Sequence, residues 1–115
     1  MLEMMTKAEF SGNTLTVRFL IERLDMNVVR AVREEVIGYL NGKPSPVWID
    51  MSNIAYMDSS GMGTLKMLQD HVRGYEGQLI LSKINQPQMM LLKLSRLDTY
   101  FQFEEAQKPD LQTFD

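Results

Sequence analysis

The sequence predicts a single α/β domain, residues 1–115, built on a mixed sheet of about four to five strands flanked by helices. The chain has 115 residues, 44% of them hydrophobic, which is the size and apolar content of one domain with its own core. Cysteine is absent, and this excludes a disulfide framework and thiolate metal sites. Segments of period-two and helical hydrophobic spacing alternate, with only short turn signals between them.

The first half of the chain predicts a hairpin followed by a helix. After the turn signal Ser11-Gly12-Asn13, apolar and polar residues alternate over 14–19, as in a strand with one buried face. Asp25 is the expected N-cap of the next helix, whose apolar residues recur at helical spacing until Asn41-Gly42.

The second half predicts alternating strands and helices, and therefore parallel strands joined by right-handed crossovers. Residues 47–51 are apolar enough for a central strand covered on both faces, which places Trp48 in the core. A helix is expected from Asp58 or Ser59 to the glycines at 74 and 77. The remaining expected elements are strands over 78–82 and 100–103, a helix that begins at Pro87, and a short closing helix over 104–115.

Charge and composition narrow the classes of function. The formal net charge of −3 opposes generic binding to DNA or RNA. Glu3 and Lys7 interrupt the N-terminal apolar residues, and no run approaches the roughly 18 apolar residues of a membrane span. We therefore expect a soluble, cytoplasmic protein with no nucleic-acid partner.

The sequence offers little for catalysis. Ser59 and Ser60 lack a Gly-x-Ser-x-Gly elbow, and His71 would lie about 18 Å from Ser59 along the same helix axis. A lone histidine without cysteine makes no histidine-rich metal site, and no phosphate-binding glycine loop is present in the sequence. We expect no catalytic residue, cofactor or metal. Only a small hydrolase using Asp50 or Asp58 remains as an enzymatic alternative.

The run VWIDMSNIAYMDSSGMGTLKML resembles the core of the STAS domain, the family of bacterial anti-sigma factor antagonists. In this family an apolar strand leads through a short loop into Asp-Ser-Ser-Gly and a helix. The resemblance extends to Leu24-Asp25, to residues 77–81 and to residues 94–98, so nearly the whole chain is covered. One departure is Glu22-Arg23, where the family commonly has a glycine followed by an acidic residue. This difference changes the charge of a surface that the resemblance places near Ser59.

The resemblance implies partner switching. Ser59, the serine directly after the aspartate, would be phosphorylated by a serine kinase that is also the anti-sigma factor partner, and a phosphatase would reset it. The residues expected to contact the partner are Asp25, Asp58, Ser60, Gly61, Met62 and Gly63. The chain is expected to be a monomer or a weak homodimer. The alternative is a structural or adaptor subunit of a larger assembly, such as a lipid-transport or signalling complex, in which Ser59 only helps to start a helix.

Physical chemistry agrees with a switch at this position. A phosphate in the first turn of a helix meets free backbone N–H groups and the positive end of the helix dipole, so the fold tolerates it. Beside Asp58, however, it adds charge that would repel a partner. Gly61 and Gly63 would allow a partner backbone to approach closely, and Met62 and Met67 would offer a soft contact surface.

Overall fold

The computed structural model describes residues 3–105 and contains a five-stranded sheet in the order β1-β2-β4-β6-β7. Strands β1 (Thr6–Ser11) and β2 (Thr14–Phe19) form an antiparallel hairpin, closed by a turn in which Gly12 adopts a φ of 59°. All later neighbours in the sheet are parallel, which confirms the predicted mixed sheet. The remaining strands of this sheet are β4 (Val47–Asp50), β6 (Leu79–Ser82) and β7 (Gln102–Phe103).

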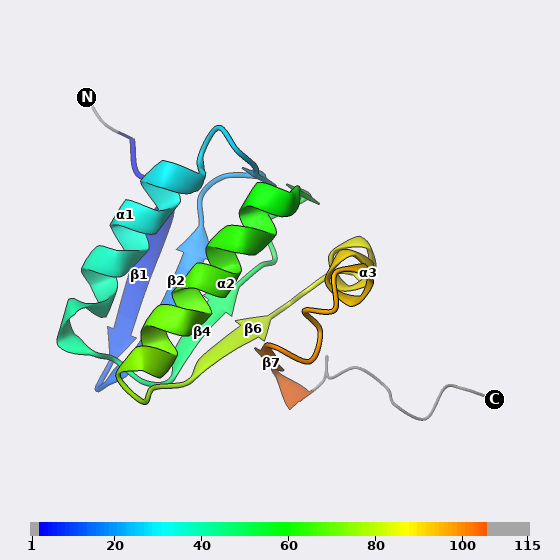
Figure 1. The fold of residues 1–115 in the computed structure, drawn as a ribbon. Helices are drawn as coiled ribbons and strands as arrows, with labels where there is room; N and C mark the ends of the chain where they lie inside the picture. Colours follow the sequence, from blue (N-terminus) through cyan, green and yellow to red (C-terminus); the bar gives the residue numbers. More distant parts are fainter. Residues whose placement is uncertain (1–2, 106–115) are drawn as a thin grey trace.

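Three α-helices accompany the sheet: α1 (Val29–Tyr39), which continues into the 3₁₀ turn η1 (Leu40–Gly42), α2 (Ser59–Gly74) and α3 (Gln86–Leu94). Helices α1 and α2 lie side by side against one face, and α3 lies beyond the end of β6 (Figure 1). Helix α2 ends at Gly74, as predicted. Helix α3 begins one residue before Pro87, because Asn85 and Gln88 form a capping box around that start. The expected closing helix lies almost entirely outside the described residues.

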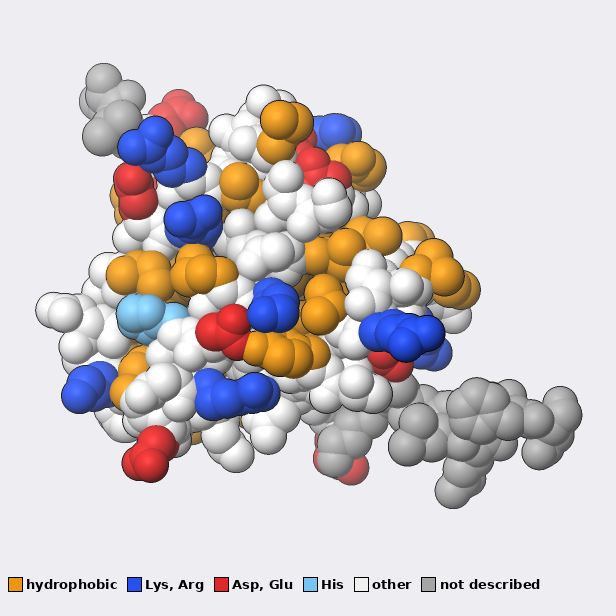
Figure 2. Space-filling model, in the orientation of Figure 1, with side chains coloured by type: hydrophobic (Ala, Val, Ile, Leu, Met, Phe, Trp, Pro, Cys, Tyr) orange, Lys and Arg blue, Asp and Glu red, His pale blue; other side chains and the backbone are white. Residues whose placement is uncertain are grey.

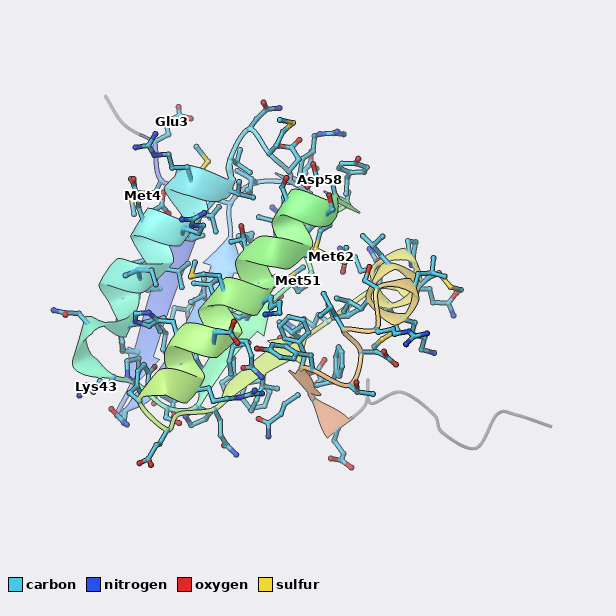
Figure 3. The ribbon with its side chains drawn as sticks, in the orientation of Figure 1. Glu3, Met4, Lys43, Met51, Asp58 and Met62 are labelled. Carbon is cyan, nitrogen blue, oxygen red and sulfur yellow. The ribbon has the colours of Figure 1, made fainter. Side chains whose placement is uncertain are left out.

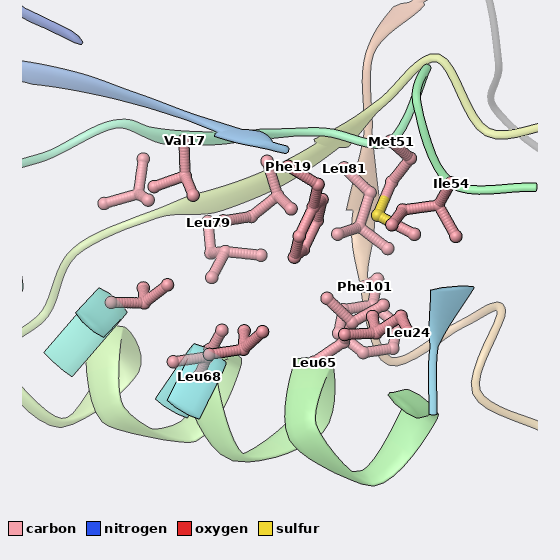
Figure 4. Close-up of a cluster of buried hydrophobic side chains, with 14 of the residues drawn as sticks. Val17, Phe19, Leu24, Met51, Ile54, Leu65, Leu68, Leu79, Leu81 and Phe101 are labelled. Carbon is pink, nitrogen blue, oxygen red and sulfur yellow. The ribbon is translucent and has the colours of Figure 1, made fainter. Parts of the chain in front are cut away.

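The hydrophobic core lies between the sheet and the helix pair (Figure 4). Every second residue of β2, β4 and β6 points to this side, and the apolar stripes of α1 and α2 pack onto them. The fully buried members from strands and helices include Leu15, Val17, Val47, Ile49, Leu81, Val32, Val36, Leu65, Leu68 and Val72.

The opposite face of the sheet carries no helix among residues 3–105, so the prediction of a strand covered on both faces is wrong. Val47 and Ile49 are fully buried under the helices, whereas Trp48 and its neighbour Ile80 are only half-buried on the other side. The reason is topological. The chain moves in one direction from β2 to β4 to β6, and successive right-handed crossovers in one direction place both helices on the same face.

Two very short strands form a second, parallel pair that periodicity did not predict. They are β3 (Arg23–Leu24) and β5 (Tyr56–Met57). Strands of two residues are too short to show an alternating pattern. They nevertheless connect the segment before α1 to the segment before α2.

Asp50, at the end of β4, ties neighbouring strands together. Its Oδ2 lies 3.8 Å from Nε of Arg18 on β2 and 3.5 Å from Nζ of Lys83 after β6. The backbone N–H of Ser52 donates to its Oδ1 at 2.9 Å. Burial alone raises the pKa of Asp50, but the hydrogen bonding to Ser52 and the charge of Lys83 outweigh burial, so the pKa lies below its ordinary value.

A carboxyl group whose pKa is lowered by folding stabilises the folded state at pH values above its pKa in the unfolded chain. This contribution is lost as the pH falls through the pKa of the group in the folded state. Asp50→Asn should therefore lower the free energy of unfolding by roughly 1 to 2 kcal/mol at neutral pH, and by progressively less below about pH 4. Urea unfolding at pH 7 and at pH 3 measures the difference.

The matched control is Glu9→Gln, because the Glu9 carboxylate also faces Arg18, at 3.4 Å, but is exposed. This change should cost at most about 1 kcal/mol at either pH. An Asp50→Asn penalty of equal size at both pH values would contradict the assigned role of the charge.

Candidate functional site

The junction between β5 and α2 lies against the loop that precedes α1. Because β5 pairs in parallel with β3, with Leu24 opposite Met57, the loop after β3 reaches the first turn of α2. The backbone carbonyl of Glu22 accepts hydrogen bonds from the N–H groups of Ala55 and Tyr56, at 2.7 and 3.1 Å. These backbone pairings bring two segments that are distant in the sequence into one surface.

Asp58 caps α2 and also holds this loop. Its Oδ1 accepts the backbone N–H of Gly61 at 3.0 Å, which is the N-cap hydrogen bond expected at the helix start. Its Oδ2 accepts the backbone N–H of Met26 at 3.3 Å. One carboxylate, at the start of α2 (Figure 3), thus satisfies a donor of the helix and a donor of the neighbouring loop.

Asp25 organises the turn before α1 and does not cap the helix itself, so the predicted cap is wrong. Its Oδ1 accepts the backbone N–H of Asn27 at 3.0 Å. Its carbonyl accepts the N–H groups of Val28 and Val29, and α1 begins only at Val29, without a side-chain cap. The pairing of β3 with β5 ends at Leu24, so a separate turn is needed before the helix.

The two serines of the junction differ in accessibility. Ser59 is the first residue of α2 and is exposed, whereas Ser60 is half-buried. Since Asp58 supplies the cap, the start of α2 does not depend on the Ser59 hydroxyl. The first-turn position places Ser59 near backbone N–H groups that have no partner within the helix.

The two glycines that follow play different parts. Gly61 is buried, and a Cβ atom there would lie 2.3 Å from the carbonyl oxygen of Leu24. The close approach predicted at Gly61 is therefore made by the chain's own β3, and the expected partner contact at this residue is corrected. Gly63 is exposed and has open space around its Cα, as an external contact requires.

The expected soft surface of Met62 and Met67 is also corrected. Met62 is 6% exposed and belongs to the core (Figure 3), and Met67 is half-buried beside Ile37 between the two helices. The helical spacing itself carried this signal, because Met62 lies three residues before Leu65, on the same face of α2. The exposed apolar side chains near the junction are instead Met26 and Tyr56, at 72% and 45% exposure.

Hydrophobic side chains also reach the surface around the start of α2 and over α3 (Figure 2). On α3 the exposed apolar residues are Met90 and Leu94. A hollow of about 730 Å³ lies elsewhere, on the uncovered face of the sheet over Trp48 and Ile80, and does not reach the junction. Within residues 3–105 no three histidine, aspartate or glutamate side chains group as metal ligands, and no helix is long and apolar enough to cross a bilayer.

The fold and the junction define a class of protein. It is a small α/β domain in which a strand leads into a capped helix whose first residue is an exposed serine. A model of the STAS domain matches residues 6–108, and the chain belongs to that family. Over 53 residues it is 32% identical to a STAS-domain containing protein of Pseudomonas aeruginosa, strain UCBPP-PA14. That match covers 46% of this chain and 52%, about half, of the relative. The resemblance inferred from the Asp-Ser-Ser-Gly run is confirmed at the level of the family.

Solved structures show the same fold. An anti-sigma factor antagonist from Mycobacterium paratuberculosis has a TM-score of 0.71 at 18% identity, over 92% of this chain and 86% of that one. The unphosphorylated anti-sigma factor antagonist SpoIIAA has a TM-score of 0.67 at 18% identity, over 88% of each chain. The phosphorylated form of SpoIIAA from Bacillus has a TM-score of 0.66 at 20% identity, over 85% of this chain and 89% of that one. At these identities the likeness concerns the fold.

The glycine pair provides a test of the junction. Gly61→Ala should destabilise the protein by about 1 to 3 kcal/mol, because the new methyl group meets the rigid backbone of Leu24. Gly63→Ala should be neutral or stabilise by up to about 1 kcal/mol, because alanine favours the helix and meets nothing there. Thermal and urea unfolding of the two variants measure the contrast. Equal stability of both would show that α2 moves away from β3 at little cost.

Proposed function

We propose that this protein is an anti-sigma factor antagonist that acts by partner switching at Ser59. In the unphosphorylated form it binds a serine kinase that is also an anti-sigma factor, and phosphorylation of Ser59 releases that partner. The observation that carries this proposal is that Asp58 caps α2 while the adjacent Ser59 is exposed. The serine is thus accessible at a helix start that does not need its hydroxyl.

The chemistry requires no catalytic group on this chain. In the partner kinase, the Ser59 Oγ would attack the γ-phosphorus of ATP. The new O–P bond forms as the bond to the bridging oxygen of ADP breaks, and the hydroxyl proton passes to a base of the kinase. The product carries roughly −1.5 to −2 charges, which the first-turn N–H groups tolerate within the fold.

The same charge is unfavourable in an interface built around a neutral hydroxyl. A loss of about 1.4 kcal/mol weakens binding tenfold, and an unpaired charge buried against a partner costs more. The proposed contact surface consists of the predicted residues that remain accessible or border the junction, together with the two exposed apolar side chains found there. Its members are Asp25, Asp58, Ser60, Gly63, Met26 and Tyr56.

The relatives support this proposal. SpoIIAA is described as an anti-sigma factor antagonist and has been solved both with and without its phosphate. A phosphatase that resets Ser59 and a cytoplasmic location belong to the same proposal. An adaptor role within a larger assembly differs in one respect, because it does not require a phosphate on Ser59.

Variants of Ser59 test the switch directly. The unmodified protein and Ser59→Ala should retain the partner from a native lysate, whereas Ser59→Asp should retain at least about tenfold less, since an added carboxylate enters the interface. Capture on immobilised protein followed by quantitative mass spectrometry measures retention. Ser11→Asp is the matched control, because Ser11 is an exposed serine at the end of β1 in the hairpin, outside the proposed contact surface, and this variant should retain the partner as the unmodified protein does.

Incubation of the protein with ATP and the same lysate should place phosphate on Ser59, and none should appear in Ser59→Ala. Equal retention of the partner by Ser59→Ala and Ser59→Asp would contradict the switch. A stable partner complex without phosphate on Ser59 would favour the adaptor role.

A further inference from the structure

Arg23 is a fixed cation on the outer side of the β3–β5 pair. Its Nε donates to Oδ2 of Asp25 at 3.3 Å, and its guanidinium carbon lies 4.3 Å from the centre of the Tyr56 ring. The side chain remains 64% exposed. A single long contact to a carboxylate and a stacked ring hold the guanidinium in place while most of its donors face water.

The pairing of β3 with β5 also fixes how Arg23 lies relative to Ser59. Arg23 is the direct Cα partner of Tyr56, and paired strands are about 4.8 Å apart. Ser59 follows Tyr56 by three residues, which span at most about 10 Å of chain. Arg23, Tyr56 and Ser59 are all exposed, whereas Leu24 and Met57 on the inner side of the pair are buried. A long arginine side chain and a phosphorylated serine therefore share one solvent-facing surface.

The charges around this surface are otherwise acidic. Among residues 21–28 and 52–63, which form it, Arg23 is the single lysine or arginine, while Glu22, Asp25 and Asp58 are acidic. A phosphoryl dianion offers three acceptor oxygens and up to two charges, and guanidinium binds such a group in a bidentate manner. It is a stronger ligand for Arg23 than the one carboxylate oxygen it now contacts.

We infer that Arg23 is the counter-charge of phosphorylated Ser59, and that phosphorylation draws it away from Asp25 and from the ring of Tyr56. This inference rests on the proposed phosphorylation and adds a second event to it. The phosphorylated surface then differs from the unphosphorylated one in three features: the phosphate, an uncovered Tyr56 ring and an Asp25 carboxylate without its arginine partner. A partner that contacts the Arg23 side of the junction then loses two features at once.

Phosphoserine incorporated at position 59 during translation tests the inference without a kinase. The second pKa of the phosphate, about 6 when unperturbed, is followed by ³¹P NMR in the 115-residue chain. Replacing Arg23 by glutamine should raise this pKa by about half a unit or more, because an adjacent cation favours the dianion. The contributions of Asp25, Asp58 and the helix start remain in both proteins.

Arg73→Gln is the matched control, since the Arg73 guanidinium also lies over a tyrosine ring, 5.0 Å from the centre of Tyr100, but is near the opposite end of α2, about 21 Å from Ser59 along the helix axis. It should leave the phosphate pKa within about 0.2 units of the parent. A second readout is the Nε–Hε NMR signal of Arg23, which should move on phosphoserine incorporation while that of Arg73 stays.

Equal phosphate pKa values in Arg23→Gln and Arg73→Gln would overturn the inference, as would an Arg23 signal that does not respond to the phosphate. Because the phosphoserine is incorporated during translation, these results are independent of whether a cellular kinase modifies Ser59. Failure of the partner-switching proposal is recognised separately, by the absence of phosphate on Ser59 after incubation with lysate and ATP.

Discussion

The approach of the Leu24 carbonyl to Gly61 is the contact on which the arrangement around Ser59 depends. A Cβ at residue 61 would lie only 2.3 Å from that oxygen, so any other side chain must push α2 away from β3. Separation would lengthen the hydrogen bond from Met26 to Asp58 and disturb the pairing that sets Arg23 beside Tyr56. A backbone-to-backbone contact inside the chain therefore positions the groups that surround an exposed serine.

Local sequence signals predicted the elements whose ends depend on local chemistry. The two-residue hairpin turn, the cap at Asp58 and the end of α2 at Gly74 each follow from the preferences of a few adjacent residues. The sequence predicted less well where each element lies in the tertiary structure. The apolar character of residues 47–51 does not reveal that both crossover helices lie on one side of the sheet, which leaves Trp48 at the surface.

In the candidate site, too, the features set by adjacent residues were predicted and the contacts between distant residues were not. Ser59 and Asp58 were found from their own neighbours in the sequence, because a cap and a first-turn residue are defined by adjacent positions. The second hydrogen bond of Asp58 depends on Met26, 32 positions earlier, and the role of Gly61 as a packing glycine depends on Leu24, which is also distant in the sequence. The contact of Arg23 with Tyr56 likewise arises from strands of two residues each, which no periodicity distinguishes from a loop.

The uncovered face of the sheet has an experimental consequence. Trp48 is the single tryptophan of the chain and lies half-buried on that face, beside Ile80 and on the side opposite to α1 and α2. Its fluorescence depends on the polarity around the indole. The emission therefore changes when this face of the sheet becomes more or less exposed to solvent, and when the sheet unfolds. A chemical change confined to the start of α2 leaves the surroundings of the indole as they are. The chain thus carries an intrinsic optical reporter that separates unfolding from a change of charge at Ser59.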